Sequence, residues 1–172
     1  MVRLAVIEDL KEVMEVISDA KALFKSEGSD QWQDYDNYPN EKTMLKDISR
    51  NELYVKVIDN LVVGCIVLSS EHEDAYDFIY DGNWEKSGPY GVIHRIAVRN
   101  GYYKQGVAKQ LMQHIIDVSI KNGYESIKVD TKLTNVRMVG LLEKFGFKIV
   151  GKIDLLRKDV IDKVRIALEK VL

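Results

Sequence analysis

The stretch that decides the fold reads Tyr103-Lys104-Gln105-Gly106-Val107-Ala108. Before it, the apolar run Val92–Val98 predicts a β-strand, and after it apolar residues at helical spacing predict a helix over Gln105–Ile120. The stretch therefore forms the turn between a strand and a helix. It is not a Walker A loop, because GxxxxGK[ST] is absent, and the GxGxxG fingerprint of dinucleotide-binding folds is absent too.

This turn has the features of an anion site. The first turn of a helix carries free N–H groups and the positive end of the helix dipole. Gly106 and Ala108 are small, so a phosphate could approach the backbone closely. Lys104 and Lys109 add positive charge. An ordinary strand-to-helix junction without a ligand explains the same residues equally well.

A second pattern follows the next predicted strand, Ser126–Thr131. It reads Asn135-Val136-Arg137-Met138-Val139-Gly140-Leu141-Leu142-Glu143-Lys144-Phe145-Gly146-Phe147. Its spacing predicts a helix over Val136–Phe145 that Gly146 ends. Gly140 inside this helix indicates either close packing or a tolerant surface position.

In the rest of the chain, segments with the apolar spacing of a helix alternate with segments typical of a strand. Asp9 and Glu12 predict a capping box that starts a helix ended by Gly28, and a second helix follows Pro39-Asn40. Further strands are predicted at Val2–Val6, Leu53–Ile58, Leu61–Leu68 and Lys148–Gly151, with Asp59-Asn60 as a hairpin turn and Glu71–Tyr90 as a long loop with room for a short strand. The tail, Asp154–Leu172, reads as a helix by spacing, although Val164–Leu168 is also typical of a strand. The order predicts an α/β fold in which helices cover a mixed sheet, in a single domain over residues 1–172.

Composition excludes several classes of protein. The chain has 172 residues, 46% hydrophobic and 30% charged, which is typical of a globular domain. A net charge of −2 gives no reason to expect a nucleic-acid partner. Cys65 is the only cysteine, so an intrachain disulfide and a CxxC metal site are excluded. We expect no metal and no membrane span, and a cytoplasmic location.

The two motifs together resemble the GCN5-related N-acetyltransferase (GNAT) family, whose pattern is a strand, Q/R-x-x-G-x-G/A opening a helix, a strand, and N-x-x-A-x-x-L-Y-x-K-x-G-F. The resemblance implies a central, mostly antiparallel sheet of about seven strands flanked by helices, with the tail from Val164 to Lys170 as the last strand. It implies transfer of an acetyl group from acetyl-CoA to a primary amine by direct attack on the thioester. A subgroup in bacteria carries a similar Gln-Trp…Tyr-Pro stretch and Asp-Thr-x-x-x-Asn loop. A homodimer is compatible with the resemblance.

The resemblance also implies which residues hold the cofactor. The backbone of the strand before the turn would bond the pantetheine arm, the turn amides would hold the pyrophosphate, and the next loop and helix would line the arm. The implied set is Ile96, Ala97, Val98, Tyr103, Lys104, Gln105, Gly106, Val107, Ala108, Lys109, Asn135 and Met138.

Two departures from the family pattern bear on function. Tyr103 replaces the usual Gln or Arg, which leaves binding by backbone amides intact. Leu142 replaces the Tyr that protonates the leaving thiolate in many members, so no general acid is assigned. Leu142 keeps open a second hypothesis, an acyl-CoA-binding module or sensor without transferase activity. A third hypothesis is a structural or interaction protein without any cofactor.

His94 is the candidate general base, because its strand leads into the cofactor-binding amides and an imidazole titrates near neutral pH. Asp130 is a weaker candidate. A sheet histidine held by packing, and an aspartate that orients a loop, explain the two residues equally well. His72 and His114 are expected at the surface.

The acceptor amine, on a small molecule or a peptide, is expected beside an aromatic segment between the first two helices. Its candidate contacts are Trp32, Tyr35, Tyr38 and Trp84, with acidic rims from Asp34 and Asp36. Carboxylates and ring faces favour a cationic amine. The alternative is that these rings fill a minor core.

Overall fold

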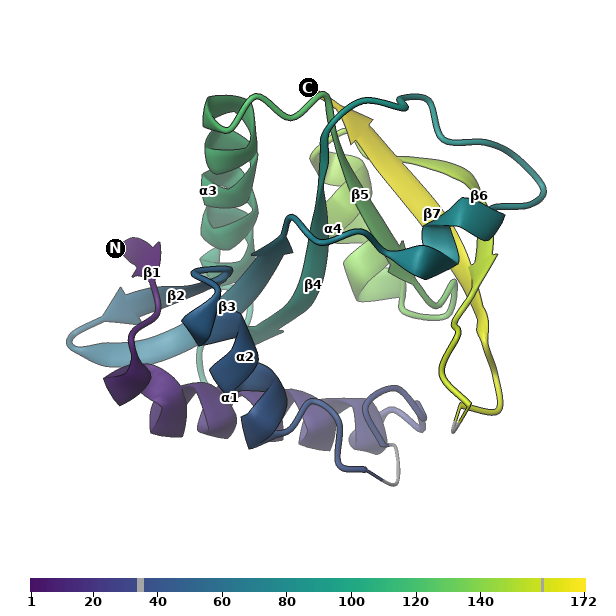
Figure 1. Cartoon of the computed structure of the whole chain (residues 1–172). Coiled ribbons are helices and arrows are strands. Elements are labelled where there is room, and N and C mark those ends of the chain that lie inside the picture. Colours follow the sequence, from purple (N-terminus) through teal and green to yellow (C-terminus); the bar gives the residue numbers. More distant parts are fainter. Residues whose placement is uncertain (34–35, 159) are drawn as a thin grey trace. The chain divides into compact units, whose positions relative to one another are not determined.

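The computed structural model describes residues 1–33, 36–158 and 160–172 and contains a mixed α/β fold (Figure 1). Its elements are β1 (Val2–Leu4), η1 (Ile7–Asp9), α1 (Leu10–Ser26), α2 (Glu41–Ser49), β2 (Leu53–Ile58), β3 (Leu61–Ser69), η2 (Asp74–Phe78), β4 (Tyr90–Val98), α3 (Val107–Lys121), β5 (Ser126–Thr131), α4 (Val136–Lys144), β6 (Lys148–Asp154) and β7 (Val164–Val171). The described strands follow the order β1-β2-β3-β4-β5-β7-β6. The predicted order of helices and strands is confirmed.

By its internal contacts the chain divides into two compact units. Unit 1 comprises Met1–Leu68 and His94–Ile115, and unit 2 comprises Ser69–Ile93 and Ile116–Leu172. Strand β4 and helix α3 each run from one unit into the other. The single domain over residues 1–172 stays a prediction, and the two units are described separately below.

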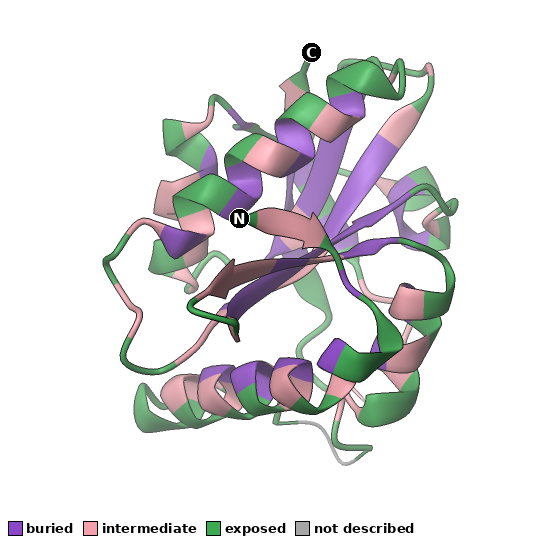
Figure 2. Cartoon of the chain, turned by 90° about the vertical axis from the view of Figure 1, so that its left-hand side faces the viewer, coloured by how far each residue is buried: buried purple, intermediate pink, exposed green. Residues whose placement is uncertain are grey.

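Unit 1 is built on the hairpin β2–β3. Asp59 and Asn60 take left-handed conformations, with φ of +48° and +63°, as a two-residue hairpin turn requires. In Figures 1 and 2, α1 and α2 lie on one face of β1–β3, and the first half of α3 lies on the other. Strand β3 is buried along nearly its whole length because helices cover both of its faces.

The core of unit 1 joins one face of α1 to the strands. Val13, Val16 and Ile17 of α1 have no exposed surface and belong to one cluster with Leu53 and Val55 of β2. Figure 2 shows this buried face of α1 turned towards the sheet. The 3.6-residue spacing of apolar side chains that predicted the helix thus produces its packing face.

The start of α1 differs from the prediction. Asp9 is the N-cap residue, but its carboxylate accepts hydrogen bonds from the Val6 amide, at 2.8 Å, and from Arg3. Glu12 does not complete a capping box, because its carboxylate accepts from the Val62 amide at 2.6 Å. The predicted start of α2 after Asn40 is confirmed, and the Asn40 side chain caps the helix by accepting from the Thr43 amide at 3.0 Å.

Unit 2 contains the first half of β4, with β5, β7 and β6. Tyr90–Val92 of β4 pairs in parallel with Ser126–Lys128, and β7 pairs antiparallel with both β5 and β6. The strand that the resemblance implied at the tail is confirmed, and the helical reading of its spacing is wrong. A central strand buried on both faces loses the two-residue alternation that would have identified it.

The segment between β3 and β4 contains η2 rather than a strand. Its nearest approach to strand structure is an isolated antiparallel bridge between Tyr80 and Lys152. Ala75 and Tyr76 of η2 are buried in a cluster with Val92 and Ile153. Within the described part of the chain, no helix is both long and apolar enough to cross a membrane.

Candidate functional site

The turn between β4 and α3 is built from residues in left-handed conformations. Gly101, Lys104 and Gly106 have φ of +86°, +62° and +81°. The side-chain amide of Gln105 donates to the Gly101 carbonyl at 2.7 Å and closes the loop. All of these residues belong to unit 1, so the conformation of the turn is defined within that unit.

The turn ends in the amides of a helix start. The Gln110 amide donates to the Gly106 carbonyl at 3.0 Å, so Gly106 occupies the N-cap position and α3 begins at Val107. The first-turn amides therefore have no acceptor within the helix. Among the described atoms, a Cβ on Gly106 would meet only Nε2 of Gln110, at 3.8 Å, so the space in front of the backbone is open. These features fit the pyrophosphate of a nucleotide cofactor.

The strand before the turn is firmly held. The Arg99 amide donates to the Val63 carbonyl at 2.8 Å, and the Arg99 guanidinium donates to the Val62 carbonyl at 2.7 Å. The three predicted pantetheine contacts lie just before Arg99: Ala97 is buried, while Ile96 and Val98 are half-buried. They lie in the same unit as the turn, so the structure brings these two parts of the predicted set together.

His94 lies at the start of the unit 1 part of β4. Burial, with a further contribution from the Arg95 charge, lowers the pKa of its imidazole to about 3. The ring is therefore neutral at physiological pH, the form that can accept a proton. A pKa this low makes His94 a weak base in the cofactor-free protein.

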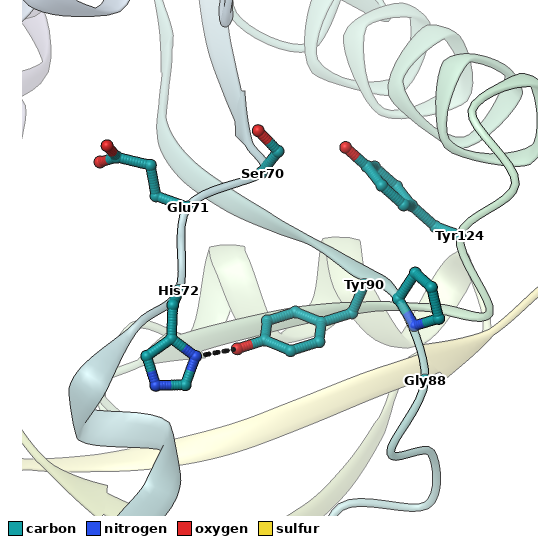
Figure 3. Close-up of a pocket in the computed structure, with 7 residues that line it drawn as sticks. Ser70, Glu71, His72, Gly88, Tyr90 and Tyr124 are labelled. Carbon is teal, nitrogen blue, oxygen red and sulfur yellow. Dashed lines mark hydrogen bonds between the residues drawn. The ribbon is translucent and has the colours of Figure 1, made fainter.

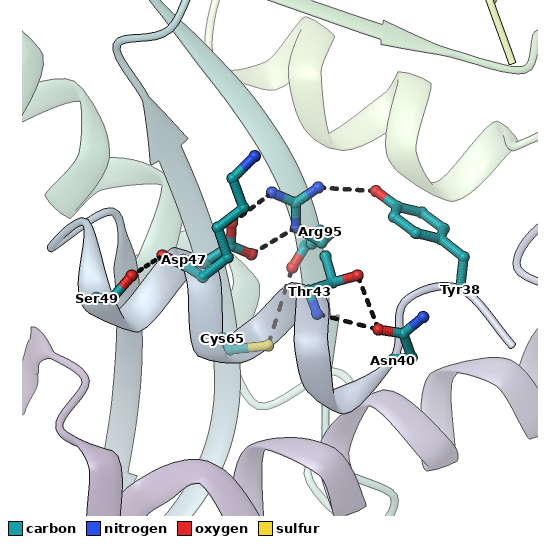
Figure 4. Close-up of polar contacts among 8 residues, drawn as sticks. Tyr38, Asn40, Thr43, Asp47, Ser49, Cys65 and Arg95 are labelled. Carbon is teal, nitrogen blue, oxygen red and sulfur yellow. Dashed lines mark hydrogen bonds and ion pairs between the residues drawn. The ribbon is translucent and has the colours of Figure 1, made fainter. Parts of the chain in front are cut away.

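Arg95 forms a buried polar network that sequence reasoning missed (Figure 4). Its Nε and Nη2 donate to the two carboxylate oxygens of Asp47, at 2.8 and 2.9 Å, and its Nη1 donates to the Tyr38 hydroxyl at 2.7 Å. Burial raises the pKa of Asp47, while the charge of Arg95 opposes that rise. In the sequence, Asp47 looks like an ordinary charged residue on the surface of a helix. Its pairing with Arg95 is therefore visible only in the folded structure.

Two of the predicted acceptor contacts lie in unit 1. Trp32 packs edge-on against Phe24 of α1, with ring centroids 5.4 Å apart, and contributes to the core cluster. For Trp32 this agrees with the alternative that these rings fill a core, although the core is the main cluster of unit 1 and not a minor one. Tyr38 contacts Arg95 as described above. The predictions for Asp34 and Tyr35 fall outside the described residues.

Trp84 lies in unit 2 and already contacts a cation of the chain. Its indole N–H donates to the Tyr76 carbonyl at 2.8 Å. The Lys128 ammonium lies 4.6 Å from the Trp84 ring centroid and 3.9 Å from that of Tyr90. Lys128 is only 4% exposed, and burial lowers its pKa. The Trp84 ring thus makes a cation–π contact with a lysine of the protein itself.

Asn135 and Met138 stand at the start of α4 in unit 2. The Asn135 side chain accepts from the Met138 amide at 3.2 Å and caps the helix. Leu142 has no exposed surface and is a core residue in this chain. The resemblance implied a Tyr at this position in many members of the family. Gly140 does not mark close packing against a neighbouring helix, because a Cβ there would meet no described atom of the protein within 4 Å.

Asp130 lies near the end of β5, beside Tyr76. The Tyr76 hydroxyl donates to Asp130 at 2.8 Å. Burial raises the pKa of the Asp130 carboxyl, and Tyr76 and Arg165 act in the opposite direction. A carboxylate with a raised pKa is a better proton acceptor than an exposed one.

A cavity of about 260 Å³ lies elsewhere in unit 2 (Figure 3). It is lined by Ser70, Glu71, His72, Gly88, Pro89, Tyr90 and Tyr124, none of which is a predicted site residue. His72 contacts Asp77 at 2.9 Å and the Tyr90 hydroxyl at 3.4 Å, and the Asp77 contact raises the pKa of His72.

The surface placement predicted for the two other histidines is correct only in part. His72 is exposed, as predicted. His114 is half-buried, because its ring packs against the Tyr54 ring with centroids 5.3 Å apart.

Comparison with known proteins identifies the class. The model of the acetyltransferase (GNAT) family matches residues 14–147, and the chain belongs to this family. It is similar to a GNAT-family acetyltransferase from Streptococcus agalactiae 2603 (32% identity over 100% of this chain and 95% of that one, TM-score 0.90). A putative acetyltransferase from Staphylococcus aureus MU50 is 28% identical over 99% of this chain and 98% of that one, with a TM-score of 0.72. A search of curated proteins gave no match.

A third structure shares the fold. The GNAT-family acetyltransferase from Listeria monocytogenes 4b F2365 has a TM-score of 0.76 at 19% identity, over 100% of this chain and 94% of that one. The predicted family and the predicted fold class are therefore confirmed. Family membership makes the chain an acyltransferase by class, and the residue roles remain proposals.

Proposed function

We propose that the protein transfers an acetyl group from acetyl-CoA to a primary amine of a small molecule or peptide. The observation that carries the proposal is the turn before α3, where an open glycine and helix-start amides without intrahelical acceptors fit a phosphate. Membership of the GNAT family supports the choice of acetyl-CoA.

The residues of the turn have separate tasks in this proposal. The amides of Val107, Ala108 and Lys109 hold the pyrophosphate, and the Lys104 and Lys109 ammonium groups add attraction at the exposed rim. The backbone of Ile96–Val98 holds the pantetheine arm as an added strand would. Acetyl-CoA supplies the thioester carbonyl that the amine attacks, with the CoA thiolate as leaving group. Asn135 and Met138 are assigned to the same arm on family resemblance alone.

Proton transfer is assigned to His94 of β4 and Asp130 of β5, the two candidate bases named from the sequence. Attack by the amine nitrogen makes its remaining protons strongly acidic, so even a weak base such as neutral His94 could accept one as the new C–N bond forms. Asp130 is the second candidate, because its raised pKa favours proton acceptance. The thiolate takes its proton from water, since Leu142 has no proton to donate.

The buried position of Leu142 also favours a second function. A GNAT fold that binds acetyl-CoA without using it would act as a binding module or sensor. The two functions differ in one outcome: only the enzyme releases free thiol when an amine is added.

The test measures binding and release on the same protein. A saturable rise in melting temperature with acetyl-CoA is expected for both functions, and its absence would exclude both. Amine-dependent thiol release, measured against a panel of monoamines, polyamines and N-terminal peptides, is expected for the enzyme. Tight binding with no release for any amine would contradict the transferase and favour the module.

A further inference from the structure

Arg95 adopts an unusual backbone conformation inside a strand. Its φ is +50°, in the left-handed region that residues with a Cβ enter at a cost in free energy. Such a conformation persists only where neighbouring contacts hold it. One contact is on the backbone itself: the buried thiol of Cys65 lies 3.8 Å from the Arg95 carbonyl oxygen.

The Arg95 side chain supplies the other contacts. All three guanidinium nitrogens donate hydrogen bonds, two to Asp47 and one to Tyr38. The Arg95 and Asp47 side chains are only 12% and 5% exposed. A forked Arg–carboxylate pair with little exposure has a fixed geometry, because both hydrogen bonds constrain the planes of both groups.

The network joins three parts of unit 1 (Figure 4). Asp47 comes from α2, and Tyr38 comes from the segment between α1 and α2. Arg95 directly precedes Ile96–Val98, the proposed pantetheine strand. The network thus links the segment proposed to line the acceptor pocket to the strand proposed to hold the cofactor.

We propose that Asp47 and Arg95 are positioning residues that set the Tyr38 segment relative to the cofactor strand, and that acceptor binding and turnover depend on this ion pair. The inference rests on the proposed function. Asp47 and Tyr38 lie outside the residues proposed to hold CoA, and the end of the cofactor strand is also held by the contacts of Arg99 with Val62 and Val63. Affinity for CoA is therefore expected to change little when the pair is broken.

A second ion pair in unit 1 provides a matched control. Arg3 donates from Nη1 and Nη2 to both carboxylate oxygens of Asp9, at 2.6 and 2.9 Å, so this pair is also forked, although through a different set of guanidinium nitrogens. This pair joins β1 to the start of α1, whereas the Asp47 pair joins α2 to β4. Asp9→Asn and Asp47→Asn therefore remove the same charge from two forked Arg–Asp pairs at different places in the unit.

The experiment compares Asp47→Asn, Tyr38→Phe and Asp9→Asn with the unaltered protein. It measures kcat and KM for the best amine, the Kd for CoA by calorimetry, and the melting temperature. Asp47→Asn is expected to lower kcat/KM for the amine by about 10- to 100-fold, the scale of a lost hydrogen bond to a charged group. The Kd for CoA should stay within about 3-fold in this variant. Asp9→Asn should leave kcat, KM and the Kd for CoA each within about 3-fold of the unaltered protein.

Tyr38→Phe keeps the ion pair and removes only the hydroxyl, so it tests the link even if Asp47→Asn does not fold. It is expected to raise the KM for the amine about 3- to 10-fold. Equal kinetic losses in Asp47→Asn and Asp9→Asn, or unchanged kinetics in Tyr38→Phe, would overturn the inference while the proposed function stands. An unaltered protein that acetylates no amine would overturn both.

Discussion

Gly64 of β3 lies directly against Val107, the first residue of α3: a Cβ on Gly64 would lie 2.7 Å from Cγ1 of Val107 and 3.1 Å from the Ala97 carbonyl oxygen. No real side chain tolerates such an approach, so one of the two elements would have to move. The absence of a side chain at this position of β3 thus allows the first turn of α3 to pack closely against the strand.

Gly64→Ala is therefore expected to weaken both the fold and the site. Overpacking of this kind costs about 1–3 kcal/mol of unfolding free energy. The shift of the first turn of α3 should also reduce affinity for CoA. Denaturant unfolding and calorimetric titration measure the two effects. Unaltered stability in this variant would show that Val107 moves freely and that Gly64 has no positioning role.

Gly106→Trp is expected to abolish CoA binding, because the indole would fill the open space in front of the helix-start amides. The variant also places a side chain at a φ of +81°, so a strain control is needed. Gly28→Trp supplies it: Gly28 has a φ of +70°, lies after α1, and has no described atom within 4 Å of an added Cβ. Calorimetry should show binding lost in the first variant and kept in the second. Retained binding in both would refute the placement of the site.

Ala108→Glu tests the same site without backbone strain. A carboxylate in the first turn of a helix interacts favourably with the helix dipole by about 0.3–1 kcal/mol, so stability should be kept or raised. The same charge would repel a pyrophosphate at the neighbouring amides, and we expect a loss of CoA affinity of roughly tenfold or more. Thermal unfolding and titration separate the two effects. Unchanged affinity would mean that the phosphates bind elsewhere.

Gly140→Ala should stabilise the protein. Gly140 lies inside α4, a Cβ there meets nothing within 4 Å in the described part of the chain, and alanine is favoured over glycine in a helix by about 0.5–1 kcal/mol. Chemical denaturation measures the gain. If the variant also loses CoA affinity, the cofactor packs against this position and the glycine is functional. A loss of stability would contradict the open environment of Gly140.

The pH dependence of the unfolding free energy tests the protonation state of the His94 imidazole. Its pKa is about 3 in the folded protein, against 6.5 ordinarily, so between these values the unfolded chain binds one proton more. The stabilisation is complete above pH 6.5 and is lost as the pH falls towards 3, with a slope of up to about 1.4 kcal/mol per pH unit. His94→Asn should flatten this slope. Equal slopes in the variant and the unaltered protein would contradict the neutral state of the His94 imidazole.

The sequence predicted best the elements whose signals are local. The hairpin at Asp59-Asn60, the start of α2 after Asn40 and the boundaries of β5 were predicted correctly, because each depends on neighbours in the chain. The turn between β4 and α3 was located for the same reason. The last strand, β7, required the family resemblance, because its strand partner β5 is distant in sequence.

The polar contacts of the candidate site depend on the fold and could not be predicted. Asp47 and Arg95 are 48 residues apart, and neither belongs to a motif. Trp84 was predicted to contact a substrate cation, and nothing local in the sequence indicates that Lys128 lies over its ring. A glycine inside an apolar run, as at Gly64, is a sequence signal of close approach that could have been used.

Single-turnover transfer of an isotopically labelled acetyl group tests the central claim most directly. Excess protein, labelled acetyl-CoA and the amine panel are mixed, and free thiol and labelled amide are quantified together by mass spectrometry. The account predicts, for at least one primary amine, thiol and labelled amide in equal amounts. Thiol without amide, or bound acetyl-CoA with neither product for any amine, would contradict it.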